Sequence, residues 1–255
     1  MDGKKIREIQ EQYVVKSNEL IQKGRYNLTV QQQKLVLYAI SKIKKGDQPD
    51  QWYELSIEEV CSVMGLKYDN TGYYYKAIKD DLKYLTSPQW VKLEDKSEWS
   101  VSWFGSVGIV PLSGTVYVKF HEMLEPHLFE LVNRYTQYQL YEVLTLKGKY
   151  SIRLYELLRS YLMQDELRKG KEKEVDYSVD ELRSLLCCDS YKKWPEFERC
   201  VLRKAVDEIN KCSDIVRISY DTIKRGKSVV RITFIITYPT MMEKLMAHEE
   251  QRKRL

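Results

Sequence analysis

The amino-acid sequence predicts an α+β protein that consists of two tandem winged helix-turn-helix domains related by internal duplication. Three observations support this fold class: one short motif occurs twice, a helical pattern precedes and follows each copy, and strand-like segments end each half of the chain. The length of 255 residues accommodates two such modules, each of roughly 120 residues.

The duplicated motif covers residues 56–64 and recurs at residues 178–186, 122 positions later. Ser56 is followed three residues on by Glu59, and Ser178 by Glu181, which is the spacing of a capping box that satisfies free amide groups at a helix start. We therefore expect a short helix to begin at each serine.

A helix is also expected before each copy of the motif. The first begins at Thr29, with Gln32 in the capping-box position, and continues to Ile43, whereas the second covers residues 152–161. Both segments are apolar around most of their circumference, which is typical of helices buried in a core.

A longer amphipathic helix is expected after each copy. Between Gly72 and Leu85, and again between Pro195 and Lys211, apolar residues recur at helical spacings of three and four. Pro195 suits the first helical position, where its missing N–H costs nothing. In a helix-turn-helix, this third helix is the one that enters the major groove of DNA.

Strand-like segments follow the third helix in each half. Residues 215–220 and 228–238 are rich in β-branched and aromatic side chains and flank a polar turn at residues 224–227, which predicts a β-hairpin with a basic tip. In the first half we expect two or three strands, with glycines as turn points. The segments are residues 90–93, 99–104 and 115–120, and the turn points are Gly105, Gly108 and Gly114.

The two domains are expected to join near Thr136, which gives domains of residues 1–135 and 136–255. Residues 120–132 and 138–146 have helical patterns. We interpret residues 164–177 as a charged loop inside the second domain, because the opposite charges of residues 168–174 nearly cancel.

Positive charge is concentrated in the second half of the chain. Residues 1–130 contain 17 Lys and Arg against 18 Asp and Glu, whereas residues 131–255 contain 25 against 19. Residues 192–231 alone hold 11 basic and 6 acidic side chains, a surplus equal to the net charge of +5. This concentration favours an acidic partner such as nucleic acid, although charge runs also occur on faces that meet only solvent.

The third helix and the hairpin of the second half supply the main candidate residues. We expect Arg199, Arg203 and Glu196 to read bases, since arginine can form a two-pronged hydrogen bond with guanine. The residues expected to contact phosphates are Lys192, Lys193, Lys204, Lys224, Arg225 and Lys227, together with Lys76, Lys79, Lys83 and Tyr73 of the first half. A charged face that touches nothing is the alternative for each lysine and arginine, and a half-buried ring is the alternative for Tyr73.

Other functional classes find little support in the sequence. The five cysteines lack the spacing of a metal or redox site, the three histidines are too scattered for a metal triad, and residues 226–228 lack the first glycine of a phosphate loop. No apolar run approaches the roughly 18 residues of a membrane span. We expect a cytoplasmic DNA-binding protein that is not an enzyme and uses no cofactor or metal.

Several segments resemble the iteron-binding plasmid replication initiators of the RepB type. They are residues 15–20, 28–35, 150–158 and 197–210, the last ending in Glu208-Ile209-Asn210. The resemblance extends from about Val14 to Tyr238, which is nearly the whole chain.

This resemblance implies a protein that binds direct repeats in a plasmid origin, usually as a monomer, helps to open an adjacent AT-rich segment, and recruits the host initiator and replicative helicase. It also implies chaperones as partners and a homodimer, formed through the first domain, that represses its own gene at an inverted repeat. The second domain would supply the main DNA contacts and the first auxiliary ones. Glu198 stands where some relatives are more basic, so the repeat read here is expected to differ.

Two other classes stay open at this point. A transcriptional regulator would share the fold but not open an origin, and direct repeats beside the gene would distinguish the two. A relaxase or nickase would cut origin DNA in the presence of magnesium or manganese, and strand scission would reveal it.

Overall fold

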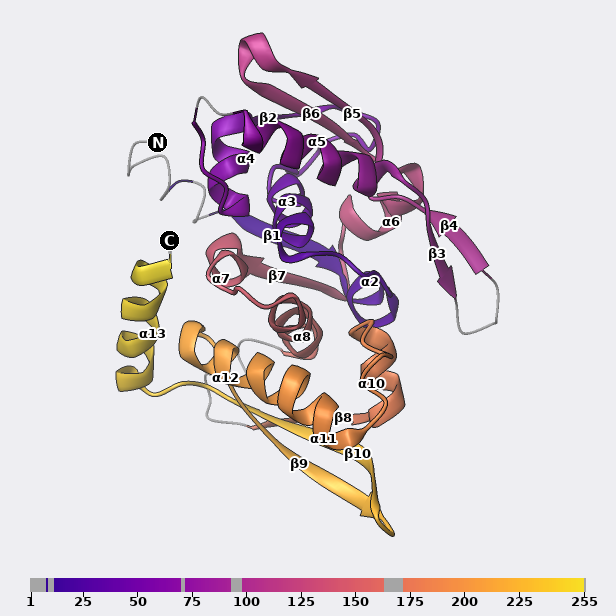
Figure 1. Ribbon diagram of the computed structural model, residues 1–255, viewed down its shortest axis with the longest axis vertical. Helices are drawn as coiled ribbons and strands as arrows, with labels where there is room; N and C mark the ends of the chain where they lie inside the picture. The colour runs from indigo at the N-terminus through magenta and orange to yellow at the C-terminus, as the bar shows by residue number, and fades with distance from the viewer. Residues whose placement is uncertain (1–7, 9–11, 70–71, 93–97, 163–171, 255) are drawn as a thin grey trace. The chain divides into compact units, whose positions relative to one another are not determined.

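The computed structural model describes residue 8 and residues 12–69, 72–92, 98–162 and 172–254. The chain forms two compact units, one of Met1–Gly24 and Leu28–Tyr141, the other of Arg25–Asn27 and Glu142–Leu255 (Figure 1). The division lies a few residues beyond the expected join at Thr136, because Thr136 belongs to strand β7 (Tyr135–Gln139), which pairs with β1 (Tyr13–Ser17) inside the first unit.

The second unit has the order of a winged helix. Its elements are α8 (Lys149–Arg159), β8 (Lys173–Ser178), α10 (Val179–Leu185), a long third helix, β9 (Arg217–Arg225), β10 (Ser228–Thr237) and α13 (Met241–Arg254). The strands form one antiparallel sheet in the order β8–β10–β9. Phe197, Ile209 and Phe234 are fully buried between the helices and this sheet.

The third helix of the second unit runs from Trp194 to Cys212 and contains a π-helical turn. It consists of α11 (Trp194–Phe197), the π turn Glu198–Leu202 and α12 (Arg203–Cys212). The expected apolar row is confirmed, since Val201 and Ala205 are buried. Pro195 is the second helical residue rather than the first, and the absence of its N–H is equally harmless there, because the first four amides of a helix have no partner within it.

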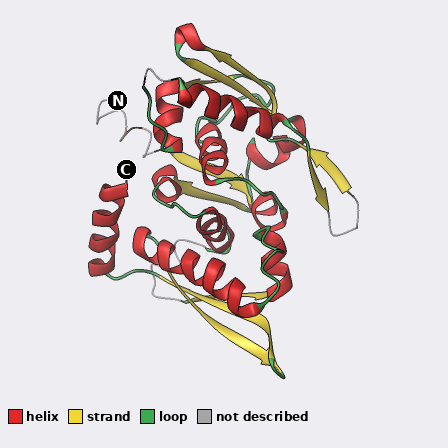
Figure 2. Cartoon of the chain, in the orientation of Figure 1, coloured by secondary structure: helices red, strands yellow, loops and turns green. Residues whose placement is uncertain are grey.

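The first unit repeats this plan with additions. Its winged-helix elements are α3 (Val30–Ile40), β2 (Tyr53–Ser56), α4 (Ile57–Met64), α5 (Tyr73–Thr86), β5 (Phe104–Val110) and β6 (Thr115–Phe120). The additional elements are β1 and β7, α2 (Asn18–Lys23), the hairpin of β3 (Gln89–Lys92) and β4 (Glu98–Val101), and α6 (Glu125–Leu128). Figure 2 shows that both units combine helices with strands.

The sheet order of the first unit, β2–β6–β5, matches the order β8–β10–β9 of the second. In each unit the strand that precedes the duplicated motif pairs with the last strand of the ribbon. The predicted fold class, two winged helices related by duplication, is therefore confirmed.

The three helix starts predicted from capping residues are correct, whereas the helix expected over residues 152–161 is α8, which begins at Lys149 and ends at Arg159. The Ser56 hydroxyl accepts the N–H of Glu59 at 3.5 Å, and the Ser178 hydroxyl accepts that of Glu181 at 3.1 Å. Thr29 and Gln32 form the complete capping box. The helix that begins there ends at Ile40, three residues before the expected Ile43.

Several predicted boundaries were wrong. Gly105 and Gly108 lie inside β5 instead of at turns, and the register of β5 and β6 shifts beside Gly105, where a β-carbon would lie 3.5 Å from the carbonyl oxygen of Phe120. Gly114 does form a turn, with a positive φ of 65°. Helical structure within residues 120–132 and 138–146 is limited to short segments, among them α6 and α7 (Leu140–Leu144).

The expected charged loop at residues 164–177 was also wrong at its end, because residues 173–177 belong to β8. Val175 and Tyr177 alternate with exposed neighbours and are buried against the core. Of the charged run at residues 168–174, residues 168–171 lie outside the described residues.

Candidate nucleic-acid interface

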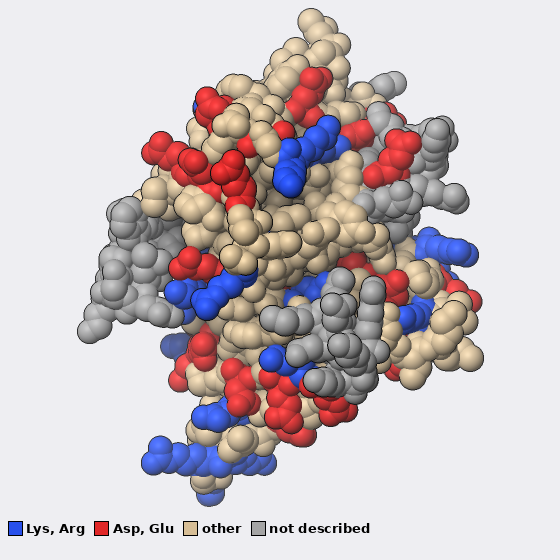
Figure 3. Space-filling view, turned by 180° about the vertical axis from the view of Figure 1, so that it is seen from behind, with Lys and Arg blue, Asp and Glu red and all other residues tan. Residues whose placement is uncertain are grey.

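The basic hairpin of the second unit is a wing longer than the sequence predicts. Strand β9 continues to Arg225, so the turn contains only Gly226 and Lys227, and Gly226 adopts a φ of 62° that favours glycine. Lys224, Arg225 and Lys227 are all exposed. Figure 3 shows Lys and Arg side chains gathered at this tip of the ribbon.

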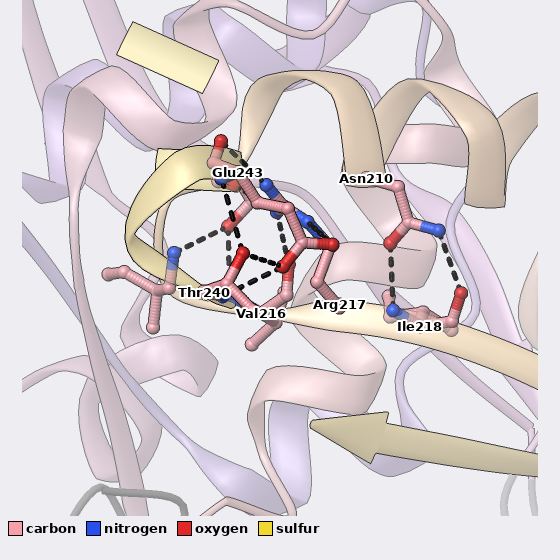
Figure 4. Close-up of polar contacts among 8 residues, drawn as sticks. Asn210, Val216, Arg217, Ile218, Thr240 and Glu243 are labelled. Carbon is pink, nitrogen blue, oxygen red and sulfur yellow. Dashed lines mark hydrogen bonds and ion pairs between the residues drawn. The ribbon is translucent and has the colours of Figure 1, made fainter. Parts of the chain in front are cut away.

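An asparagine joins the third helix to the wing. The Asn210 side-chain amide donates to the carbonyl oxygen of Ile218 and accepts the N–H of the same residue, both at 2.7 Å (Figure 4). Among the described strands β9 lies at the edge of its sheet, so these two bonds satisfy backbone groups on its outer side. The helix and the wing strand are therefore fixed to each other.

The turn that precedes the third helix is held by Arg183 of α10. Its guanidinium group donates to the carbonyl oxygen of Lys192 at 2.9 Å and lies over the Phe197 ring, 5.2 Å from the ring centre. Lys192 and Lys193 are exposed in this turn, beside the start of the helix.

The three residues expected to read bases have different surroundings. Glu196 and Arg199 are exposed. The Arg203 side chain is 59% exposed, yet its Nε and one terminal nitrogen donate to Glu198 Oε1 at 3.1 and 2.7 Å. Tyr220 of β9 donates its hydroxyl to the same oxygen at 2.9 Å. Lys204, expected to contact phosphate, is exposed next to Arg203.

The Glu198 carboxylate is stabilised in its ionised form. Partial burial opposes the charge, but hydrogen bonds from Arg203 and Tyr220 outweigh burial and lower the pKa of Glu198. Burial and the bond to Glu198 raise the pKa of Tyr220 to about 12, so its hydroxyl keeps its proton at neutral pH. The ionised carboxylate is therefore held in place by hydrogen bonds from both of these side chains.

Glu208 has a role that the sequence did not reveal. Its carboxylate accepts the N–H groups of Lys147 and Gly148 at 2.9 and 3.0 Å and thereby caps α8, for which Gly148 offers no side-chain cap. A β-carbon at Gly148 would lie 2.6 Å from Ser151 Oγ and 3.0 Å from Glu208 Oε2, so these side chains would have to shift to admit it. Arg254 of α13 donates to Glu208 Oε1 at 2.7 Å.

The corresponding helix of the first unit, α5, carries the second set of candidates. Lys76, Lys79 and Lys83 are exposed, as expected for a basic stripe. Tyr73 is 71% exposed, so the alternative of a half-buried ring was wrong for this residue. Tyr74 packs against Tyr68 instead, with ring centres 4.9 Å apart.

The wing of the first unit has a different tip from that of the second. Val110 and Leu112 are exposed at the turn between β5 and β6, and residues 99–118 contain no charged side chain. In Figure 3 this tip is tan, without Lys, Arg, Asp or Glu. The wing of the first unit therefore has an uncharged tip with exposed apolar side chains, whereas the wing of the second unit has a basic tip.

Two other kinds of feature are absent from the described part of the chain. Within the described ranges, no group of three or more His, Cys, Asp and Glu side chains is placed to hold a metal ion. Among the helices that the structure describes, none has the length and apolarity needed to cross a membrane.

Two units of three helices and a β-ribbon define a protein with tandem winged-helix domains. The chain matches the family profile described as "Initiator Replication protein, WH1" over residues 13–159 and "Initiator Rep protein, WH2" over residues 178–236. Since the first match alone covers more than half of the sequence, the chain belongs to this family of replication initiator proteins.

Individual proteins are similar to this chain over different lengths. It is 29% identical to the PI protein of Escherichia coli over 138 residues, which cover 49% of this chain and 44% of that protein. It is 23% identical to a replication initiation protein of Escherichia coli over 237 residues, which cover 90% and 71%. The chain thus spans less than half of the PI protein.

A solved structure shares the fold over almost the whole chain. The crystal structure of the Pi initiator protein in complex with iteron DNA superposes with a TM-score of 0.68 at 21% identity, and covers 90% of this chain and 98% of that one. This likeness independently supports the tandem winged-helix fold.

Proposed function

We propose that this protein initiates plasmid replication by binding direct repeats, or iterons, in its origin. The observation that carries the proposal is the third helix of the second unit, which presents Arg199 and Arg203 next to a wing tipped with basic residues. A helix that reads base edges beside a wing that contacts phosphates is a geometry suited to duplex DNA. Family membership and the iteron DNA named for the Pi complex support this assignment.

The residues take two roles in this proposal. Arg199, Arg203 and Glu196 read bases, whereas the lysines and arginines around them bind phosphates. The phosphate-binding residues are Lys192, Lys193, Lys204, Lys224, Arg225 and Lys227 in the second unit, and Lys76, Lys79, Lys83 and Tyr73 in the first. The second unit, which carries the surplus of positive charge, provides the main recognition, and the first provides auxiliary contacts.

The steps of replication initiation that come after DNA binding are also part of this proposal. The bound initiator opens an adjacent AT-rich segment in the cytoplasm and recruits the host initiator and replicative helicase, with chaperones as further partners. The initiator proposal requires binding but no chemistry on the DNA.

Binding to DNA that flanks its own gene tests the proposal. We expect a footprint over an array of direct repeats, and a plasmid that carries only this array and the gene should replicate. A protein that binds a single operator and supports no replication would instead be a transcriptional regulator.

Arg199→Ala should weaken binding to the cognate repeat by about 1 to 3 kcal/mol and leave binding to random DNA unaffected. Equal losses on both DNAs would contradict base reading.

We further propose that the first unit forms a homodimer through the outer edge of β5. Within the described part of the chain this strand pairs with β6 alone. Natural sheet edges are usually protected by charges, yet residues 99–118 have none, and Ser106 and Val110 are exposed along the edge. A second copy of the same strand can pair with this edge by backbone hydrogen bonds, and the dimer would repress the gene at an inverted repeat.

A lysine placed on this edge tests the dimer. Ser106→Lys should convert the protein to a monomer in sedimentation experiments and abolish binding to the inverted repeat, while binding to a single iteron continues. Ser62→Lys adds the same charge to an exposed position on α4 and should leave the dimer intact. A Ser106→Lys protein that dimerises as strongly as the wild type would rule out the β5 edge.

A further inference from the structure

Glu198 and Arg203 meet only because the third helix contains a π turn. Residues five positions apart on a regular α-helix point about 140° away from each other and cannot pair. Here the N–H of Arg203 bonds the carbonyl oxygen of Glu198, the bond that defines a π turn, and both side chains emerge on one face. Such turns often occur at functional sites, which directs attention to what this one holds.

The wing fixes the position of the Glu198 carboxylate. Tyr220 reaches Glu198 from β9, and its ring packs against the buried ring of Phe234 at 6.2 Å between centres. The side chain of Glu198 is 19% exposed, against 59% for Arg203. The acceptor is thus held at the base of the helix face, and the guanidinium group extends outward from it.

The contacts leave one end of the guanidinium group available for a ligand. Arginine has five N–H groups, of which the one on Nε and one on a terminal nitrogen point to Glu198, and the guanidinium group also hydrogen-bonds Tyr220. The remaining N–H groups can form the paired bonds that recognise the O6 and N7 atoms of guanine. The adjacent carboxylate disfavours a phosphate at this place, since both are negatively charged.

We propose that Glu198, braced by Tyr220, is a positioning residue that orients Arg203 toward a single guanine and so determines specificity at that base pair. The inference rests on the proposed DNA-binding function and adds two residues to it. Without the carboxylate the long Arg203 side chain samples many rotamers, and these must be ordered when the base is bound. The guanidinium group is also then able to turn to any nearby phosphate, which adds affinity without sequence information.

The test compares matched variants on a library of iterons in which every base pair is substituted singly. Glu198→Ala and Arg203→Ala should relax preference at the same base pair. Glu198→Ala should weaken cognate binding by about 3-fold to 10-fold, with binding to random DNA unchanged or stronger. Tyr220→Phe should show a smaller loss at that same base pair. Asp207→Ala removes one negative charge from an exposed position on α12 and should leave the preference unchanged.

Three other results would contradict either this inference or the proposed function. Equal gains in affinity for cognate and random DNA with Glu198→Ala would mean that Glu198 only repels phosphates, and would overturn the inference. Relaxed preference at many base pairs would indicate a general disturbance of the helix and would overturn it as well. If the wild-type protein itself shows no preference for any base pair, the proposed function fails instead, so the two failures are distinguishable.

Discussion

The cap that Glu208 provides for α8 leads to a prediction about stability. Glu208→Ala removes a helix cap, which contributes about 0.5 to 2 kcal/mol. It also removes a charged hydrogen bond to Arg254, worth about 1.5 to 3 kcal/mol when little exposed, and the two side chains are only 13% and 15% exposed. In this variant Arg254 still pairs with Glu250 at 2.7 Å, so its positive charge keeps a partner. We expect a loss of about 2 to 5 kcal/mol in the free energy of unfolding.

Urea unfolding at pH 7, with an unchanged dependence on denaturant, measures this loss. Asp207→Ala is the matched control, because it removes the neighbouring carboxylate from an exposed position and should change stability by less than about 0.5 kcal/mol. Equal losses for the two variants would refute the capping role.

The same side chain predicts a dependence on pH. Burial alone would raise the pKa of Glu208, but hydrogen bonds from Ser151, Arg254 and the two backbone N–H groups just before α8 outweigh it and lower the pKa below 4.5. A lowered pKa in the folded state means that the stabilisation is complete above about pH 4.5 and is lost as pH falls through the folded value. The difference between wild type and Glu208→Ala should therefore shrink on acidification, and a difference that grows would contradict this reasoning.

Two further predictions concern the wing. Replacing Lys224, Arg225 and Lys227 together with alanine should lower affinity for all DNA sequences and reduce the salt slope by up to about 0.9 for each phosphate that the wing no longer neutralises; titrations at several salt concentrations measure this, and an unchanged slope would remove the wing from the interface. Asn210→Ala should cost about 1 to 3 kcal/mol of stability, because the N–H and carbonyl of Ile218 lose their partners; thermal unfolding checks this, and a neutral effect would show that water replaces the amide.

Much of the fold could be predicted because its signals are local. A serine or threonine at a helix start is followed by its partner three residues later, and the capping bonds of Ser56, Ser178 and Thr29 are present as expected. The mistakes arose where local signals conflict. Glycine usually marks a turn, yet Gly105 lies in a strand, at the irregularity in the pairing of β5 with β6. The alternation of Val175 and Tyr177 with polar residues was present in the sequence but was obscured by the adjacent charged run.

The kinds of residue in the candidate site could be predicted from the sequence, but the contacts among them could not. The basic wing, and the lysines and arginines on and beside the third helix, were evident from the sequence alone. The π turn was not, because i to i+5 pairing leaves no pattern that distinguishes Glu198 and Arg203 from other charges on an exposed face. Glu208 and Asn210 stood out only as part of a family resemblance, since their partners at Gly148 and Ile218 are set by the tertiary fold.

The paired hydrogen bonds between Asn210 and Ile218 have a consequence for the DNA. If both contact DNA as proposed, a third helix and a wing strand joined in this way adjust less freely to the curvature of a duplex, which favours a duplex that bends to fit them. Bending 20 to 30 base pairs costs about 1 to 6 kcal/mol, and the cost is lowest where pyrimidine–purine steps make the helix axis easy to kink. We therefore expect iterons to be selected partly for flexibility at positions that no side chain touches.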